Sequence, residues 1–172
     1  LGPNLAPRTE YTWSVTVTDN HGETAEGTSR FETGLLNGSA FEGKAQWITH
    51  APDKASPVSP VLYKDFVVQG NVKKARLYAT ALGVYEAEIN GEPVDDTYFH
   101  PGWTNYRKRL QYQTCAVTMH SSKNRVALTL ANGWYKGKLG FMPQPNHYGD
   151  TTATLAALCI TYEDGHEEWL GT

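Results

Sequence analysis

Two loops hold most of the side chains that could bind a ligand. The first spans residues 95–109 and the second spans residues 132–150, and both mix aromatic rings with acidic, amide and basic groups. Carboxylate and amide oxygens suit a hard cation such as calcium, with backbone carbonyls completing the coordination shell. The oxygen donors of the two loops are Asp95, Asp96, Asn105, Asn146 and Asp150.

The same two loops have the composition of a carbohydrate-binding surface. Sugars present apolar C–H faces and many hydroxyls, so they suit an aromatic platform ringed by carboxylates, amides and cations. We expect Trp103 and Trp134 to supply apolar walls, with Asn132 among the polar groups. The alternative is that the two tryptophans close a hydrophobic core while the acids cap turns.

Catalysis within this chain is not expected. A glycosidase needs two carboxyl groups that face each other across the scissile bond, roughly 5–10 Å apart. Asp95 and Asp96 are adjacent in sequence, so they cannot easily straddle a sugar. Glu86 and Glu88 lie two residues apart on one face of a predicted strand, where we expect them to be solvated. No catalytic triad is indicated.

Length and charge bound the class of protein. The 172 residues allow one good hydrophobic core, or one domain and a fragment of another. A net charge of −3, with one short basic run at residues 107–109, argues against nucleic acid as a partner. No apolar run approaches the ~20 residues that span a bilayer, so no membrane partner is expected. The N-terminus lacks a signal-peptide pattern and looks cut from a longer protein, which leaves cytoplasmic and exported locations open.

Period-two alternation predicts the elements that position the loops. Residues 11–17 alternate strictly, and with a second strand ending near Phe31 they predict an N-terminal hairpin. Asn90-Gly91 is the typical type I′ hairpin turn. No window has helical spacing, and the pattern of short strands predicts an all-β sandwich. Further strands are expected at residues 61–68, 75–81, 85–89, 112–117, 125–130, 152–162 and 167–170.

Glycines and cysteines complete the predicted organisation. Three segments are expected: an N-terminal piece at residues 1–36, a linker at 37–44 and a main module at 45–172. The linker contains the tripeptide Asn37-Gly38-Ser39, a glycosylation acceptor pattern that a plain turn also explains. Both cysteines lie in alternating runs and are expected to be small buried residues, although a disulfide between strand neighbours stays open. They are Cys115 and Cys159.

Several separated motifs occur in an order that carries a resemblance. Pro-Gly-Trp-Thr-Asn-Tyr stands at 101–106, Asn-Gly-Trp-Tyr-Lys-Gly at 132–137 and Asn-His-Tyr-Gly-Asp at 146–150. With residues 77–91, they resemble the N-terminal module of bacterial α-L-rhamnosidases, glycoside hydrolase family 78, from roughly residue 45 to the end. Four N-terminal segments resemble the closing half of a fibronectin III-like domain: residues 5–7, 11–13, 19–22 and 31–35.

The resemblance implies a fold, a partner and a site. The fold would be a jelly-roll-like, galactose-binding-like sandwich, next to an (α/α)6 barrel of the same polypeptide that carries the catalytic carboxylates. Some related modules bind L-rhamnose through calcium, held by an acid–amide pair before the Pro-Gly-Trp motif. The matching residues here are Asp95 and Asp96, with Asn146 from the second loop.

The expected function is therefore non-catalytic. The chain would be an accessory module of an α-L-rhamnosidase that positions rhamnosylated glycans for the barrel. A structural spacer or dimerisation domain without a ligand is the competing class. An autonomous enzyme ranks last.

Overall fold

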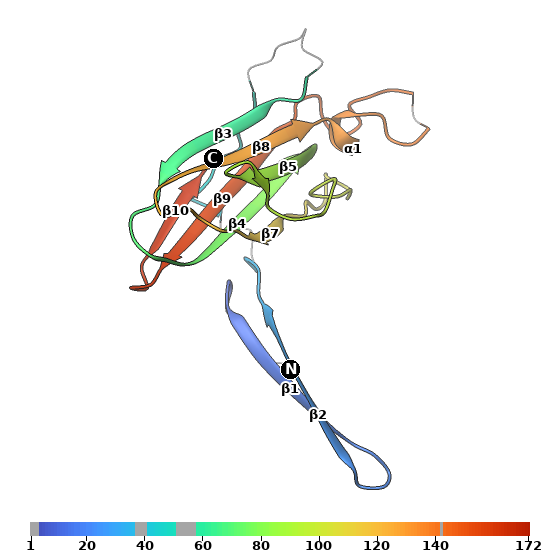
Figure 1. The fold of residues 1–172 in the computed structure, drawn as a ribbon. Coiled ribbons are helices and arrows are strands. Elements are labelled where there is room, and N and C mark those ends of the chain that lie inside the picture. Colours follow the sequence, from blue (N-terminus) through green and yellow to red (C-terminus); the bar gives the residue numbers. More distant parts are fainter. Residues whose placement is uncertain (1–3, 37–40, 51–57, 142) are drawn as a thin grey trace. The chain divides into compact units, whose positions relative to one another are not determined.

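The computed structural model describes residues 4–36, 41–50, 58–141 and 143–172 (Figure 1). The chain folds into two compact units, Leu1–Ala40 and Phe41–Thr172. The tripeptide at 37–39, residue 40 of the predicted linker and residues 51–57 lie outside the described residues.

An antiparallel hairpin forms most of the described part of the N-terminal unit. Strand β1 (Glu10–Thr18) pairs with β2 (Thr24–Glu32) along its whole length. Tyr11 lies opposite Phe31, and their rings stack with centroids 5.6 Å apart. The odd-numbered residues of β1 place an apolar row on one face, as period-two alternation requires. The predicted N-terminal hairpin is confirmed.

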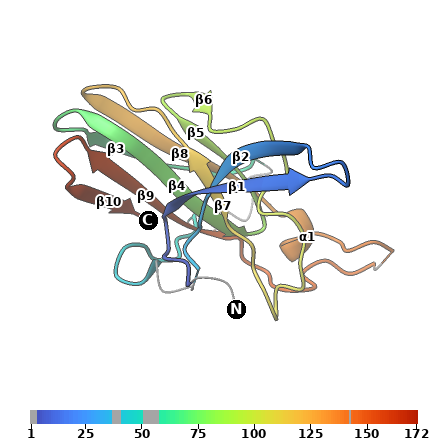
Figure 2. The same ribbon diagram turned by 90° about the horizontal axis from the view of Figure 1, so that it is seen from below.

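The main unit contains two four-stranded antiparallel sheets, and Figures 1 and 2 both show β3 beside β8 and β9 beside β10. The first sheet has the order β10-β9-β4-β7, with strands Glu167–Gly171, Ala153–Tyr162, Val72–Leu82 and Gln113–Ala116. The second has the order β3-β8-β5-β6, with strands Val61–Val67, Lys123–Ala131, Val84–Ile89 and Glu92–Pro93.

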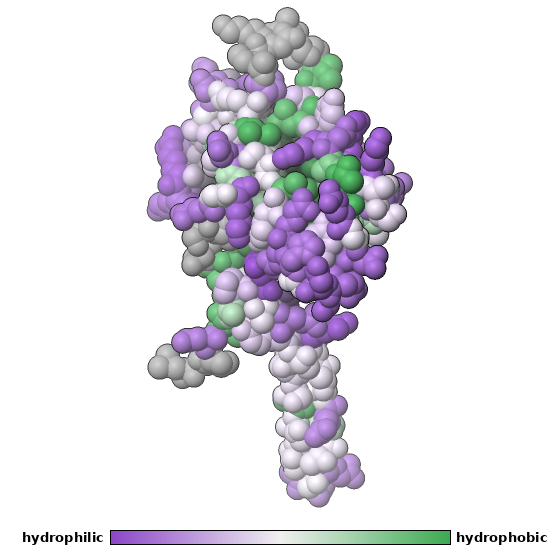
Figure 3. All heavy atoms as spheres, turned by 90° about the vertical axis from the view of Figure 1, so that its left-hand side faces the viewer, coloured by the Kyte–Doolittle hydropathy of each residue, from purple (hydrophilic) through white to green (hydrophobic). Residues whose placement is uncertain are grey.

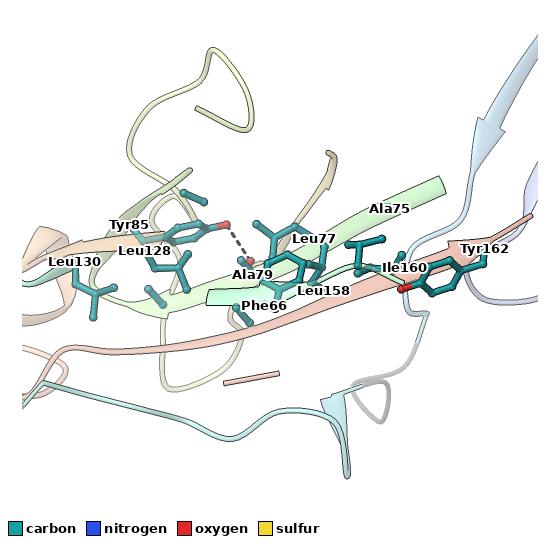
Figure 4. Packing of buried hydrophobic residues seen from close by; sticks show 14 residues of the cluster. Phe66, Ala75, Leu77, Ala79, Tyr85, Leu128, Leu130, Leu158, Ile160 and Tyr162 are labelled. Atoms are coloured by element: carbon teal, nitrogen blue, oxygen red, sulfur yellow. Dashed lines mark hydrogen bonds between the residues drawn. The ribbon is translucent and has the colours of Figure 1, made fainter. Parts of the chain in front are cut away.

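One hydrophobic core lies between the two sheets (Figure 4). Leu77 and Leu158 come from the first sheet, and Leu128 comes from the second; all three are almost fully buried. The Tyr85 hydroxyl of the second sheet donates a hydrogen bond to the Ala79 carbonyl of the first at 3.0 Å. The predicted all-β sandwich is therefore confirmed, while its jelly-roll topology stays a prediction.

Two glycine-dependent connections fix the ends of the second sheet. Gly83 alone links β4 to β5 with φ +134°, and a Cβ there would lie 3.2 Å from the Thr152 methyl carbon and closer still to a backbone oxygen. Asn90 and Gly91 have φ values of 58° and 85°, which is the type I′ turn that the sequence predicts.

A single helical turn, α1 (Gly133–Lys136), interrupts the expected all-strand pattern. It lies inside the second loop, where no helix was expected, because a four-residue turn is too short to show helical periodicity. No helix among the described residues is long and apolar enough to cross a membrane.

The two cysteines lie on opposite sides of strand β4. Cys115 of β7 pairs with Leu77, and Cys159 of β9 pairs with Arg76. Both are free thiols. Because each interstrand step is about 4.8 Å, two steps separate them by more than a disulfide can bridge.

An apolar groove of about 510 Å³ opens between the edge strands β3 and β10. Its lining includes the core residues Leu77, Leu128 and Leu158. Figure 3, which views the side where β10 lies, shows apolar patches set among polar residues. Part of the hydrophobic core is therefore reached from the surface at this edge.

Candidate functional site

The first candidate loop leaves β6 and is fastened to the sandwich before it reaches β7. The Tyr85 backbone N–H donates to the His100 carbonyl at 2.8 Å, and Pro101 is fully buried. The Thr104 hydroxyl closes the distal part of the loop by donating to the Arg109 carbonyl at 2.5 Å. The loop is therefore a fixed structure rather than a loose connection.

Asp95 is the centre of a hydrogen-bond network at the base of this loop. Its Oδ1 accepts hydrogen bonds from the Thr97 N–H at 3.0 Å and the Thr97 hydroxyl at 2.8 Å, and lies 3.1 Å from His100 Nε2. Its Oδ2 accepts a weaker bond from the Cys115 thiol at 3.4 Å. Both carboxylate oxygens are therefore occupied within the protein.

This network changes the acidity of two of its members. Burial alone would raise the pKa of Asp95, but the hydrogen bonds from Thr97, His100 and Cys115 outweigh it and lower the pKa to about 2. Burial, reinforced by the Asp95 carboxylate, raises the pKa of Cys115 to about 12. Cys115 is thus a protonated hydrogen-bond donor at neutral pH, and no reactive thiolate forms there.

The second loop begins as β8 ends and folds back on α1. The Asn146 N–H donates to the Lys136 carbonyl at 2.8 Å, and the Tyr148 N–H donates to the Tyr135 carbonyl at 3.3 Å. Gly149 lets Tyr135 lie against the backbone, because a Cβ at Gly149 would be 2.6 Å from two ring carbons. The segment that returns through residues 146–149 is thereby held beside the helical turn.

The two loops meet through a cluster of three tyrosines, Tyr106, Tyr135 and Tyr148. The Tyr106 ring contacts the other two edge-on, with centroids 5.3 and 5.0 Å away. Arg107 Nη2 donates to the His147 carbonyl at 3.0 Å, which adds a polar link between the loops. Burial raises the pKa of Tyr106, so its hydroxyl stays protonated and donates to the Gly102 carbonyl at 3.2 Å.

Aromatic side chains on the same loops remain open to solvent. Tyr98 is 74% exposed, Phe99 66% and Trp103 55%, and Phe141 is fully exposed. Phe99 contacts Trp134 edge-on at 6.1 Å, which joins the two loops a second time. Exposed apolar groups gathered on neighbouring loops are typical of a recognition surface.

The structure brings together only some of the predicted site residues. Trp134 is half-buried between the loops, and Trp103 is exposed rather than part of the core. Asp96, Asn132 and Asn146 are all exposed. In residues 4–36, 41–50, 58–141 and 143–172, no hydrogen bond joins Asp95 or Asp96 to Asn146.

One predicted calcium ligand, Asp95, already accepts hydrogen bonds from the protein. Thr97 and His100 contact Oδ1, while within the described part of the chain Oδ2 accepts only the Cys115 thiol. Among the described residues, no group of three His, Cys, Asp or Glu side chains could hold a metal ion. Calcium binding stays a prediction.

Sequence reasoning missed the residues that join the loops. Tyr106, Tyr135 and Tyr148 lie within the predicted aromatic loops, but their contacts with one another were not expected. Each stands inside a motif that was noted: Tyr106 in residues 101–106, Tyr135 in 132–137 and Tyr148 in 146–150. The sequence therefore showed the aromatic residues of each loop, but it did not show that the two loops contact each other.

The arrangement of sheets and loops agrees with a known family. Residues 70–172 match the family model described as the α-L-rhamnosidase N-terminal domain. The chain belongs to this family. Residues 1–37 match a second model, described as the Rha78A-like N-terminal immunoglobulin domain. The prediction for that segment named a fibronectin III-like domain, which shares the β-sandwich architecture with immunoglobulin domains.

Relatives of this rhamnosidase N-terminal domain are much longer proteins. An α-L-rhamnosidase of Streptomyces avermitilis is 44% identical over 128 residues, which are 73% of this chain and 12% of that enzyme. The crystal structure of native α-L-rhamnosidase from Aspergillus terreus matches with a TM-score of 0.86 at 31% identity, over 98% of this chain and 20% of that one. The structure of the Streptomyces avermitilis α-L-rhamnosidase complexed with L-rhamnose matches with a TM-score of 0.64 at 32% identity, over 91% and 17%. The chain thus spans a fifth or less of the length of these relatives.

Proposed function

We propose that this domain is a non-catalytic carbohydrate-recognition module of an α-L-rhamnosidase. It would hold rhamnose-containing glycans near the catalytic domain of the same polypeptide. The observation that carries the proposal is the surface formed by the two loops, which carry exposed aromatic rings and are joined by the tyrosine cluster.

The chemistry of this surface supports a sugar ligand. The apolar C–H face of a deoxy sugar stacks well on an exposed ring, and Trp103 and Phe141 offer such rings on different loops. The exposed side chains of Asp96, Asn132 and Asn146 supply hydrogen-bonding partners for sugar hydroxyls on the same loops. The first loop is fastened to the sandwich at His100, and the tyrosine cluster joins it to the second loop, so the loops need to gain little order on binding.

A relative provides the substrate class. One structural neighbour is an α-L-rhamnosidase in complex with L-rhamnose. The match has 32% sequence identity and covers 91% of the present chain. L-rhamnose is therefore the first sugar to test.

The test is a thermal melt of the chain with L-rhamnose, in calcium and again in a chelator. A sugar at 100 times its Kd should add about 2.7 kcal/mol to the free energy of unfolding, which is a shift of several degrees. Trp103→Ala should reduce the shift. Trp47→Ala is the matched control, because Trp47 is similarly exposed (45%) but lies outside both loops. A shift that needs calcium would support the metal prediction.

A second candidate is a structural domain without a ligand, acting as a spacer or in dimerisation. Its supporting observation is that the loops satisfy many of their own polar groups, as Asp95 and Tyr106 show. On this hypothesis no sugar shifts the melt, and Trp103→Ala behaves like Trp47→Ala. A concentration-dependent mass in sedimentation would then favour dimerisation over a spacer.

A further inference from the structure

The outer face of the second sheet carries a row of side chains that the loops do not use. Tyr63 of β3 lies opposite Ala127 of β8, which in turn lies opposite Glu88 of β5. These strands are adjacent in the sheet, and period-two alternation places all three side chains on the face away from the core. Because alanine is small, the row has a depression between an aromatic ring and a carboxylate.

This depression is part of a surface hollow of about 540 Å³. Tyr63, Glu88 and Arg125 contribute side chains of three kinds to its wall, an aromatic ring, an acid and a base. Asn90 and His120 line the end nearest the hairpin turn. A monosaccharide is smaller than this volume, so a single sugar ring or the end of a glycan fits.

Arg125 is held in place before any ligand arrives. Its Nε and Nη2 donate to the two carboxylate oxygens of Asp65 at 2.6 and 2.8 Å. Its guanidinium lies 4.4 Å from the centre of the Tyr63 ring, and its backbone N–H donates to Asn90 Oδ1 at 2.8 Å. A guanidinium fixed in this way loses little freedom when it binds a ligand.

Several polar groups of the hollow are still free to bind. The Glu88 carboxylate and the His120 ring have no hydrogen-bond or ion-pair partner within the described parts of the chain. Arg125 uses its Nε and Nη2 on Asp65 and retains further N–H groups. Tyr63 is 63% exposed despite the guanidinium beside it.

The charges around the hollow favour a neutral ligand. Asp65 already pairs with Arg125, so the site has no surplus positive charge for an anion. Glu88 alone is a weak attraction for a cation at a solvated surface. A polyhydroxylated neutral molecule can use the fixed donors, the free acceptor and the ring together.

We propose that this hollow binds a neutral sugar residue, as a carbohydrate subsite separate from the two loops. The guanidinium of Arg125 and the carboxylate of Glu88 would bind hydroxyls, and Tyr63 would contact the C–H face. The proposal rests on the sheet register and does not depend on whether the loops bind L-rhamnose.

The test is a two-dimensional ¹⁵N NMR titration of the chain with L-rhamnose, D-galactose and D-glucose, and with D-galacturonate as an anionic probe. At least one neutral sugar should shift the amide signals of β3, β5 and β8 around Tyr63 and Arg125. Tyr63→Ala and Glu88→Gln should each weaken that binding about tenfold, which equals about 1.4 kcal/mol. Val67→Ala is the matched control, since Val67 is 53% exposed on the same strand and does not line the hollow.

Three results would overturn this subsite. The first is that sugar shifts only the amide signals of residues 95–109 and 132–150. The second is that the Tyr63 and Glu88 variants bind sugar as tightly as the unaltered chain. The third is a preference for D-galacturonate over every neutral sugar. The first of these would leave the loop proposal intact. Shifts on the sheet without shifts in the loops would support the subsite and contradict the loop proposal. Glu88→Gln conserves shape on a solvated face, so it gives a readout even if Tyr63→Ala disturbs the strand.

Discussion

The surface of the two loops (residues 95–109 and 132–150) and the outer face of the second sheet are built in opposite ways. They are called the loop surface and the sheet surface. In the loop surface, aromatic contacts join the two loops. Asp95 and Tyr106 form hydrogen bonds with residues in the loops or at their base. The sheet surface rests on regular strands, and the side chains of Glu88 and His120 have no hydrogen-bond or ion-pair partner among the described residues. A protein surface can therefore obtain its rigidity either from side-chain contacts or from the backbone beneath it. Only the first kind should lose stability when a single contact is removed.

The largest expected effect is at Gly149 in the loop surface. In Gly149→Ala the new methyl would lie 2.6 Å from ring carbons of Tyr135, so the ring must move away from the backbone. Overpacking of this kind costs about 1–3 kcal/mol. We expect a lower urea midpoint, and displaced tyrosine signals for Tyr106 and Tyr148 in NMR spectra.

A double variant provides the control for this prediction. Removing the ring with Tyr135→Ala removes the obstacle, so adding Gly149→Ala to it should cost little more. If the Gly149→Ala variant were as stable as the unaltered chain, the Tyr135 ring would not pack against the backbone at Gly149.

The second prediction concerns the pH dependence that Asp95 contributes. Its pKa of about 2 in the folded chain lies below the value of about 3.9 in an unfolded chain. The carboxylate therefore stabilises the fold above pH 4, and this contribution of about 2 kcal/mol is lost as the pH falls from 4 to 2. Asp95→Asn should remove most of this dependence and lower the stability at neutral pH.

Asp96→Asn is the matched control, because Asp96 is exposed and makes no hydrogen bond within the described residues. Urea unfolding of both variants at several pH values makes the comparison. Equal losses of stability for the two variants would show that the network around Asp95 is not formed.

Much of the sandwich could be predicted because alternation is a local property. Tyr85, Ala87 and Ile89 face the core while Glu86 faces solvent, as their order alone indicates. The turn at Asn90-Gly91 was predictable for the same reason, since two adjacent residues determine its geometry.

The candidate site could be predicted only in composition. Arg107 donates a hydrogen bond to the His147 carbonyl, and the Cys115 thiol donates one to Asp95. The partners lie far apart in the sequence, so no local pattern predicts these contacts. Those contacts depend on how each loop leaves its strand. The row formed by Tyr63 and Glu88 likewise depends on the register of three strands, which is not visible along the sequence.

The third prediction compares one hydroxyl from each surface. Tyr106→Phe removes the hydrogen bond to the Gly102 carbonyl but keeps the ring contacts, so it should cost about 1 kcal/mol. Tyr63→Phe should leave the thermal midpoint unchanged, because the Tyr63 hydroxyl has no hydrogen-bond partner among the described residues. Thermal melts of the two variants suffice. A larger effect at Tyr63 would reverse the distinction between the two surfaces.

The smallest expected effect is at Asp65, whose ion pair with Arg125 lies on the exposed face of the sheet. Hydrogen bonding from Arg125 lowers the pKa of Asp65, so the pair is complete at neutral pH. Solvent-exposed pairs contribute little to stability, and Asp65→Asn should leave the thermal midpoint unchanged within error. It should instead release the guanidinium, seen as loss of the separate Arg125 Nε–H signal in NMR spectra, while Glu88→Gln should preserve that signal. A substantial loss of stability would mean that Asp65 supports the sheet itself, whereas a loss of order at Arg125 alone would mean that Asp65 only orients the guanidinium.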